Sequence, residues 1–129
     1  MAGPDLTECT SDELAETIGQ LHALKCAVER QMLVVVAEYA RREAYKEDGP
    51  ASMTAWLAYR LAVSHQTAKR WVCTAERLGS LPALAEAFGS GRLSEDQVAA
   101  LARVATPDTD ESLAAEAPGW SAAQCAALA

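Results

Sequence analysis

Residues 57–71 read LAYRLAVSHQTAKRW, two apolar, helix-forming stretches separated by three residues that end in a serine. A helix-turn-helix needs a small residue in its first helix and apolar residues beside a tight turn. Ala58 supplies the small residue, and Leu57 and Leu61 are predicted to point into the core. Ala62-Val63-Ser64 supplies the turn, with the serine as the cap of the next helix. The stretch therefore predicts a helix-turn-helix.

The second helix of this motif is predicted to have a polar outer face. Ala68 and Trp71 would form its inward face, since they lie at helical spacing from each other. The opposite face would present donors to base edges near the start of the helix. The predicted base-facing residues are Ser64, His65, Gln66, Lys69 and Arg70. Ala62 stands where glycine is often found, which is costly if its φ must be positive.

Charge is distributed unevenly along the 129 residues, whose formal net charge is -7. Residues 41–78 hold seven basic and four acidic residues, whereas the segments on either side hold two basic and seven acidic residues each. Neutralising phosphates releases counterions and dominates most DNA binding. The predicted phosphate-facing residues are Arg41, Arg42, Arg60 and Arg77. The acidic remainder repels a polyanion, so non-specific binding is expected to be weak. The alternative is an ordinary helical bundle with a polar exposed face.

A long helix is predicted to precede the motif. Thr10-Ser-Asp-Glu13 is a capping box that predicts its start, and Gly49-Pro50 predicts a stop after about Tyr45. Apolar residues recur between them at steps of three, four or seven: Leu14, Ile18, Leu21, Val28, Met32, Val35 and Tyr39. A rival function follows from this seam, namely dimerisation through Leu14, Leu21, Val28, Met32 and Val35 without any nucleic-acid contact. The core of a single domain would produce the same pattern.

Further capping signals predict short helices in the rest of the chain. Ser52 is a plausible cap, Pro82 suits a first helical position, and Ser94-Glu-Asp-Gln97 is a second capping box. A weak helix from about 108 to 117 and another from Ser121 complete an all-α fold of about six helices. We expect a flexible N-terminus over residues 1–10 and a single helical domain over 11–129. Because no stop signal follows the last helix, an N-terminal fragment of a longer protein is expected.

Several other classes of function find little support. The most apolar run, from Met32 to Ala37, is too short to cross a bilayer, and no signal peptide is evident, so a cytoplasmic location is expected. The four cysteines, Cys9, Cys26, Cys73 and Cys125, form no C-x-x-C pair and are expected to be thiols. We expect no metal site, no cofactor and no small-molecule substrate in this chain. No catalytic constellation is present either, which leaves enzymatic activity of the chain uncertain.

Four short motifs, taken in order, carry a resemblance: Asp48-Gly49, Ala68-x-Arg70, Leu78-x-x-Leu81-Pro82 and Gly91-Arg92-Leu93-Ser94. From about residue 12 to 129 the chain resembles the actinobacterial domain of unknown function that precedes an HNH endonuclease module. The resemblance implies a larger, metal-dependent nuclease with a His-Asn-His core. This chain has no Asn and only two His, His22 and His65, so that core and its divalent metal would lie elsewhere. The implied role is a DNA-binding or target-positioning module.

Overall fold

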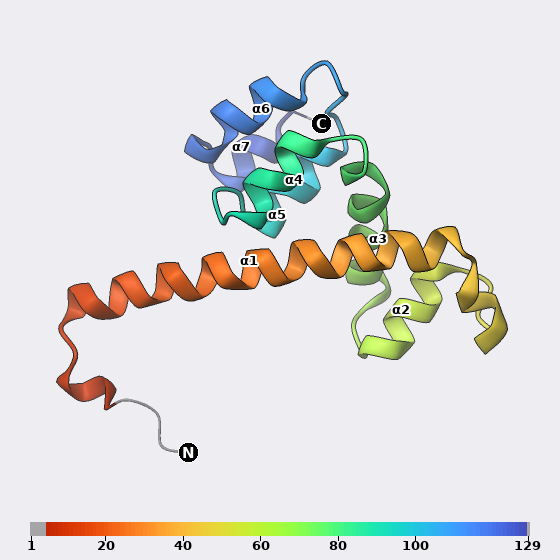
Figure 1. Ribbon diagram of the computed structural model, residues 1–129, viewed down its shortest axis with the longest axis horizontal. Helices are drawn as coiled ribbons and strands as arrows, with labels where there is room; N and C mark the ends of the chain where they lie inside the picture. The colour runs from red at the N-terminus through yellow and green to blue at the C-terminus, as the bar shows by residue number, and fades with distance from the viewer. Residues whose placement is uncertain (1–4, 129) are drawn as a thin grey trace.

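The computed structural model describes residues 5–128, which form seven α-helices and no β-strand. Figure 1 shows one long helix with the shorter helices packed around part of its length. The α-helices are α1 (Ser11–Arg41), α2 (Met53–Leu61), α3 (His65–Leu78), α4 (Pro82–Gly89), α5 (Glu95–Ala102), α6 (Asp110–Glu116) and α7 (Ala122–Ala126). Three 3-10 turns add Leu6–Glu8, Ala44–Asp48 and Ala117–Gly119. The all-helical class and the long first helix are confirmed, with one helix more than expected.

The predicted capping boxes determine where the helices begin. The Thr10 hydroxyl accepts from the backbone N–H of Glu13 at 3.1 Å, and the Thr10 N–H donates to the Glu13 carboxylate at 3.0 Å. Ser94 and Gln97 repeat this reciprocal pair at the start of α5, as do Ser121 and Gln124 before α7. Each such cap stabilises its helix by roughly 1 kcal/mol. These starts are confirmed because capping depends on residues only three positions apart.

The end of α1 differs from the prediction. The helix stops at Arg41 and does not reach Tyr45, because Glu43 takes a left-handed conformation with φ 55°. The following 3-10 turn brings Tyr45 against the core, and the indole N–H of Trp56 donates to the Asp48 carboxylate at 2.9 Å. These tertiary contacts require the chain to turn, which a continued helix would prevent.

The core lies between α3, α4 and α5, where the largest fully buried side chains are Phe88, Leu81, Leu84, Leu93, Leu101 and Val98. Helix α3 is central, since it contacts α1, α2, α4 and α5. Helix α1 adds Cys26, Leu33 and Val36 to the core, and Met32 and Tyr39 of the predicted seam pack partly against it. Four other members of the seam are exposed instead: Ile18, Leu21, Val28 and Val35.

The connection between α2 and α3 is the predicted three-residue turn, but one neighbouring residue differs. Leu57 is buried as expected, whereas Leu61 is 43% exposed and does not enter the core. The cause is local, because α2 ends at Leu61 and Ala62 reverses the chain in a left-handed conformation with φ 55°. Alanine here meets the unfavourable condition foreseen for this position, since a Cβ disfavours positive φ.

A buried carboxylate joins α6 to α4. The two carboxylate oxygens of Asp110 accept from the backbone N–H groups of Ala83 and Leu84, at 2.8 and 2.9 Å. These groups lie in the first turn of α4, where N–H groups lack partners within the helix. Asp110 also lies in the first turn of its own helix, where a negative charge complements the helix dipole. The structure uses it to cap another helix across the fold.

The N-terminal turns of α1 project beyond the rest of the molecule (Figure 1). The first buried residue of this helix is Cys26, and Gly91 approaches α1 at Ala23. We call residues 11–22 the projecting segment of α1. Within the predicted flexible N-terminus, Leu6–Glu8 form a capped 3-10 turn, and residues 1–4 lie outside the described residues. In the described part of the chain, no helix combines the length and hydropathy of a membrane span.

Candidate nucleic-acid interface

The outer face of α3 is open to solvent. Helix periodicity separates its two sides: Ala68, Val72 and Ala75 are buried. The exposed side carries the predicted base-facing residues together with the thiol of Cys73: His65, Gln66, Lys69 and Arg70. Ser64 precedes this face, and its hydroxyl accepts from the backbone N–H of Thr67 at 3.1 Å. Ser64 therefore acts as the N-cap of α3, the role that the sequence predicted for it alongside base contact.

A shallow hollow of about 390 Å³ opens beside this face. Its rim combines Gln66, Lys69 and Cys73 of α3 with Arg103, which follows α5. Arg103 was missed by the sequence analysis, because it lies far along the chain and carries no motif of its own. Only the packing of α5 against α3 brings Arg103 to the same hollow as Lys69.

The cations of this face differ in how they are paired. Arg70 donates from Nε to the Glu95 carboxylate at 2.9 Å, so its charge is largely compensated. Within residues 5–128, neither Lys69 nor Arg103 forms a salt bridge. The uncompensated positive charge at the hollow therefore comes from Lys69 and Arg103.

The four predicted phosphate-facing arginines are not gathered at the hollow. Arg41 and Arg42, at the end of α1, both pair with Glu38, at 2.6 and 2.8 Å. Hydrogen bonds from these two guanidinium groups lower the pKa of the Glu38 carboxyl to about 2. The guanidinium of Arg60 lies 5.9 Å from the ring centre of Trp56, within cation-π range. Arg77 lies exposed in the last turn of α3.

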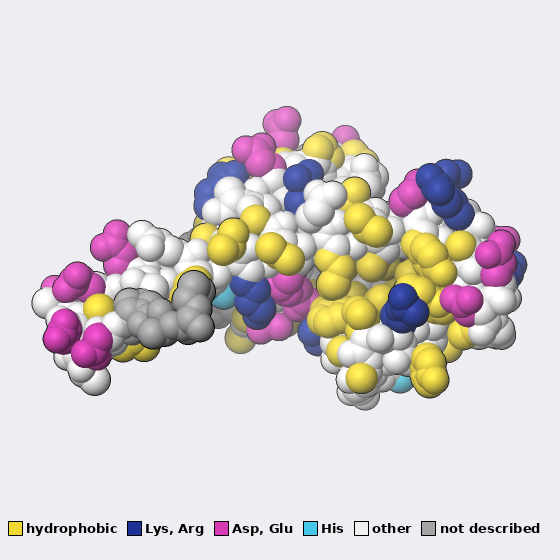
Figure 2. Space-filling model, turned by 60° about the horizontal axis from the view of Figure 1, so that its bottom comes forward, with side chains coloured by type: hydrophobic (Ala, Val, Ile, Leu, Met, Phe, Trp, Pro, Cys, Tyr) yellow, Lys and Arg dark blue, Asp and Glu magenta, His cyan; other side chains and the backbone are white. Residues whose placement is uncertain are grey.

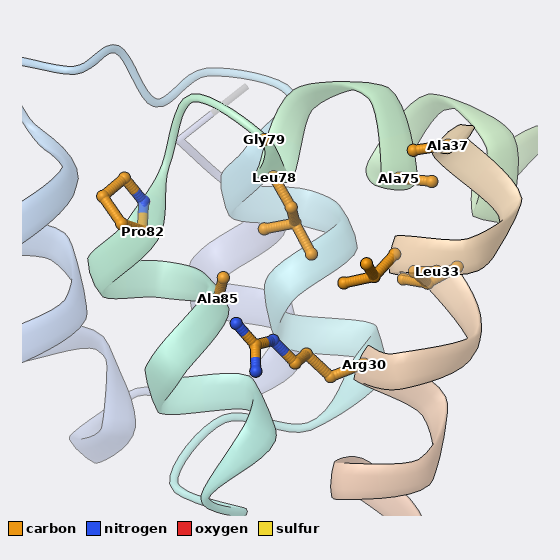
Figure 3. A pocket seen from close by; sticks show the side chains of 9 residues that line it. Arg30, Leu33, Ala37, Ala75, Leu78, Gly79, Pro82 and Ala85 are labelled. Carbon is orange, nitrogen blue, oxygen red and sulfur yellow. The ribbon is translucent and has the colours of Figure 1, made fainter. Parts of the chain in front are cut away.

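A second cavity is apolar and lies between α1, α3 and α4. Its volume is about 270 Å³, and Leu33, Leu78 and Ala85 are among the side chains that line it. Figure 3 shows the side chain of Arg30 extending from α1 across its opening toward α4. Ligand pockets usually measure roughly 300–1,000 Å³. This cavity is thus small for a drug-sized ligand, and its lining offers one charged group.

In the described part of the chain, no three His, Cys, Asp or Glu residues lie close enough to hold a metal ion. All four cysteines are free thiols, as predicted. The Cys26 sulfur lies 3.8 Å from the nearer ring nitrogen of His22, and burial raises the pKa of this thiol and of Cys125. Raised thiol pKa values disfavour the reactive thiolate.

These observations define an all-helical domain whose most distinctive polar surface is the exposed face of α3 with the adjoining hollow, where Lys69 and Arg103 form no salt bridge within residues 5–128. Its sequence matches DUF222, a domain of unknown function, over residues 11–128. The chain belongs to the DUF222 family. Comparison with curated proteins gave no match, and comparison with solved structures gave none. The family description assigns no activity, so function has to be argued from the surface itself.

Proposed function

We propose that this chain is a DNA-contacting module that positions a larger protein on its target. In this proposal α2 and α3 act as a helix-turn-helix, and the exposed face of α3 lies against the duplex. The observation that carries the proposal is the lack of salt bridges, among the described residues, at two cations that line the hollow. Lys69 and Arg103 meet there beside Gln66, and neither has an acidic partner within residues 5–128.

The connection of the two helices supports this use of α3. The backbone N–H of Val63 donates to the carbonyl of Ala58 at 3.1 Å, which closes the turn tightly. Ser64 then caps the start of α3, and the polar residues His65, Gln66, Lys69 and Arg70 that follow it are exposed. A helix N-terminus attracts phosphate through its free N–H groups and its dipole. His65 and Gln66 lie in this first turn, where recognition helices usually meet base edges.

Electrostatics limit the strength of the proposed binding. The chain carries a formal charge of -7, and Arg41, Arg42 and Arg70 are already paired with carboxylates. Three cations on or beside α3 have no salt-bridge partner in the described residues: Lys69, Arg77 and Arg103. Three phosphate contacts would give a slope of log K against log salt of about -3. Such weak binding suits a module that positions a partner better than one that holds DNA alone.

The wider protein context follows the sequence resemblance. We propose that this module serves an HNH endonuclease-like protein of actinobacterial type, with the divalent metal held by the nuclease part. Base contacts would come from His65 and Gln66, and phosphate contacts from Lys69, Arg77 and Arg103. The bacterial cytoplasm, where chromosomal DNA lies, is the location that this role requires.

The proposal is tested by fluorescence anisotropy with a short labelled duplex at low salt. The double variant Lys69→Ala/Arg103→Ala is expected to weaken binding and to reduce the magnitude of the salt slope by about two. Arg92→Ala is the matched control, because Arg92 is also an exposed cation, lies outside the hollow, and approaches Glu86 only at 3.8 Å. Equal affinity and slope in all three proteins would overturn the proposal, as would wild-type protein that binds no duplex at low salt.

A further inference from the structure

Much of the apolar seam of α1 is left uncovered by the domain, although Met32 and Tyr39 pack partly against its core. Ile18, Leu21, Val28 and Val35 are 69%, 61%, 63% and 58% exposed, which is unusual for aliphatic side chains aligned on one helix face. The domain buries Cys26, Leu33 and Val36 of the same helix instead. The reading of the seam as the domain's own core is therefore excluded for its exposed members.

The seam follows a heptad repeat. One set of positions, seven residues apart, is filled by Leu14, Leu21, Val28 and Val35. The set four residues further along is filled by Ile18, Lys25, Met32 and Tyr39. A strict repeat of 3.5 residues suits two helices that coil around each other, whereas a helix on a globular core follows about 3.6. The seam thus has the periodicity of a helix that packs against another helix.

We infer that a second copy of this chain covers the seam, with the two α1 helices packed antiparallel. An antiparallel register pairs the two heptad sets throughout: Ile18 with Val35 of the second copy, and Leu14 with Tyr39. Met32 then meets Leu21 of the second copy, and Lys25 lies beside Val28. Each layer in this arrangement pairs two apolar residues, except the layer of Lys25. There the aliphatic stem of the lysine packs against Val28 of the second copy.

Charge selects this orientation over the parallel one. A parallel pair would place Lys25 against Lys25 inside the contact, and would place the acidic first turns side by side. Those turns carry Asp12, Glu13 and Glu16, and the helix has no Lys or Arg before Lys25. The antiparallel pair instead brings the acidic turns next to Arg41 and Arg42 of the second copy. Like charges placed opposite each other disfavour the parallel pair by Coulomb repulsion.

The distribution of apolar and acidic side chains over the surface supports the same arrangement. Figure 2 shows hydrophobic side chains along α1 that widen into a larger apolar patch, and acidic side chains at the projecting end. Exposed apolar residues at the C-terminal end of α1 and on α2 include Val35, Tyr59 and Leu61. In an antiparallel pair the projecting segment of each copy extends along the C-terminal half of α1 in the other. The projecting segment of one copy and the apolar patch of the other therefore contact each other in one symmetric interface.

Sedimentation of the whole chain over a concentration series tests the inference. Wild type is expected to sediment as a dimer, and Leu21→Glu or Val28→Glu as a monomer, because each puts two buried charges into the contact. Val34→Glu is the matched control, since Val34 is an exposed valine on the same helix outside the heptad positions. Leu21 lies in the projecting segment, so Leu21→Glu should leave the domain folded, with a thermal unfolding transition like that of the wild type. A monomeric wild type, or an equal effect of the control, would overturn the inference.

Disulfide trapping tests the orientation. In a background with the half-buried Cys9 and the exposed Cys73 replaced by serine, Ile18→Cys/Val35→Cys is expected to form covalent dimers on oxidation. Leu21→Cys alone is expected to remain uncrosslinked, because antiparallel helices would hold its two copies about 16 Å apart along the axis, beyond disulfide reach. Crosslinking of Leu21→Cys without crosslinking of the pair would overturn the antiparallel arrangement. Neither experiment involves DNA, so its result is separate from the proposed function.

Discussion

The Nε of Arg70 donates to the Oε1 of Glu95 at 2.9 Å and joins α3 to the first turn of α5. The Glu95 side chain is only 10% exposed, whereas that of Arg70 is 46% exposed. A carboxylate so far removed from water requires a partner, and Arg70 is the one that the fold provides. The arginine therefore holds the two helices whose residues form the hollow, and Lys69 remains the free cation beside it.

Arg70→Ala is expected to lower the free energy of unfolding by about 1–2 kcal/mol, because Glu95 would stay largely buried without its partner. Urea denaturation of Arg70→Ala, Glu95→Ala and the double variant measures the coupling. The double variant should lose less stability than the two single variants together. Strict additivity would show that the two side chains do not interact in solution.

Asp110→Ala is expected to lower the free energy of unfolding by about 2–3 kcal/mol. The substitution leaves two N–H groups of α4, those of Ala83 and Leu84, without the acceptor that caps them. Asp108→Ala is the matched control, since Asp108 is exposed and its loss should change stability by less than about 0.5 kcal/mol. A similar effect of both substitutions in urea denaturation would contradict the capping role of Asp110.

Gly91→Ala is expected to be destabilising by about 2 kcal/mol or more. Gly91 has φ +83°, and a Cβ at this position would lie 2.7 Å from the Cβ of Ala23 on α1. Gly19→Ala provides the contrast, because Gly19 is helical and a Cβ there meets no atom within 4 Å. That variant should be more stable than wild type by about 0.5–1 kcal/mol. Thermal unfolding of both variants checks the opposite signs.

The pairing of Glu38 predicts a pH dependence at the end of α1. Its pKa is lowered from 4.5 to about 2 by Arg41 and Arg42, so the folded state favours the ionised carboxylate. The contribution of this contact is complete above pH 4.5 and is lost as the pH falls toward 2. Glu38→Gln should therefore remove part of the loss in thermal stability between pH 5 and pH 2. Identical pH profiles for variant and wild type would contradict the pairing.

Local signals explain which parts of the fold the sequence could predict. The caps at Thr10, Ser94 and Ser121 depend on residues three positions apart, and all three are found in the structure. The end of α1 at Arg41 and the exposure of Leu61 could not be predicted, because each depends on how the following turn packs. A helix propensity contains no information about that packing.

The same distinction holds for the surfaces. The exposed face of α3 follows from helical spacing, and residues His65 to Arg70 lie where the pattern put them. The partner of Arg70 and the neighbour of Lys69 could not be foreseen, since Glu95 and Arg103 come from another helix. Nor could the pattern of α1 show which apolar face the domain buries, because two faces of that helix carry apolar residues.

Chemical-shift mapping of the backbone amides by NMR tests the central claim most directly. On addition of a short DNA duplex at low salt, amides of His65, Gln66, Lys69, Cys73 and Arg103 are predicted to shift together. Those of α6, which contributes no residue to the hollow, are predicted to stay in place. An unchanged spectrum at saturating duplex, or shifts confined to residues outside the α3 face, would contradict the account.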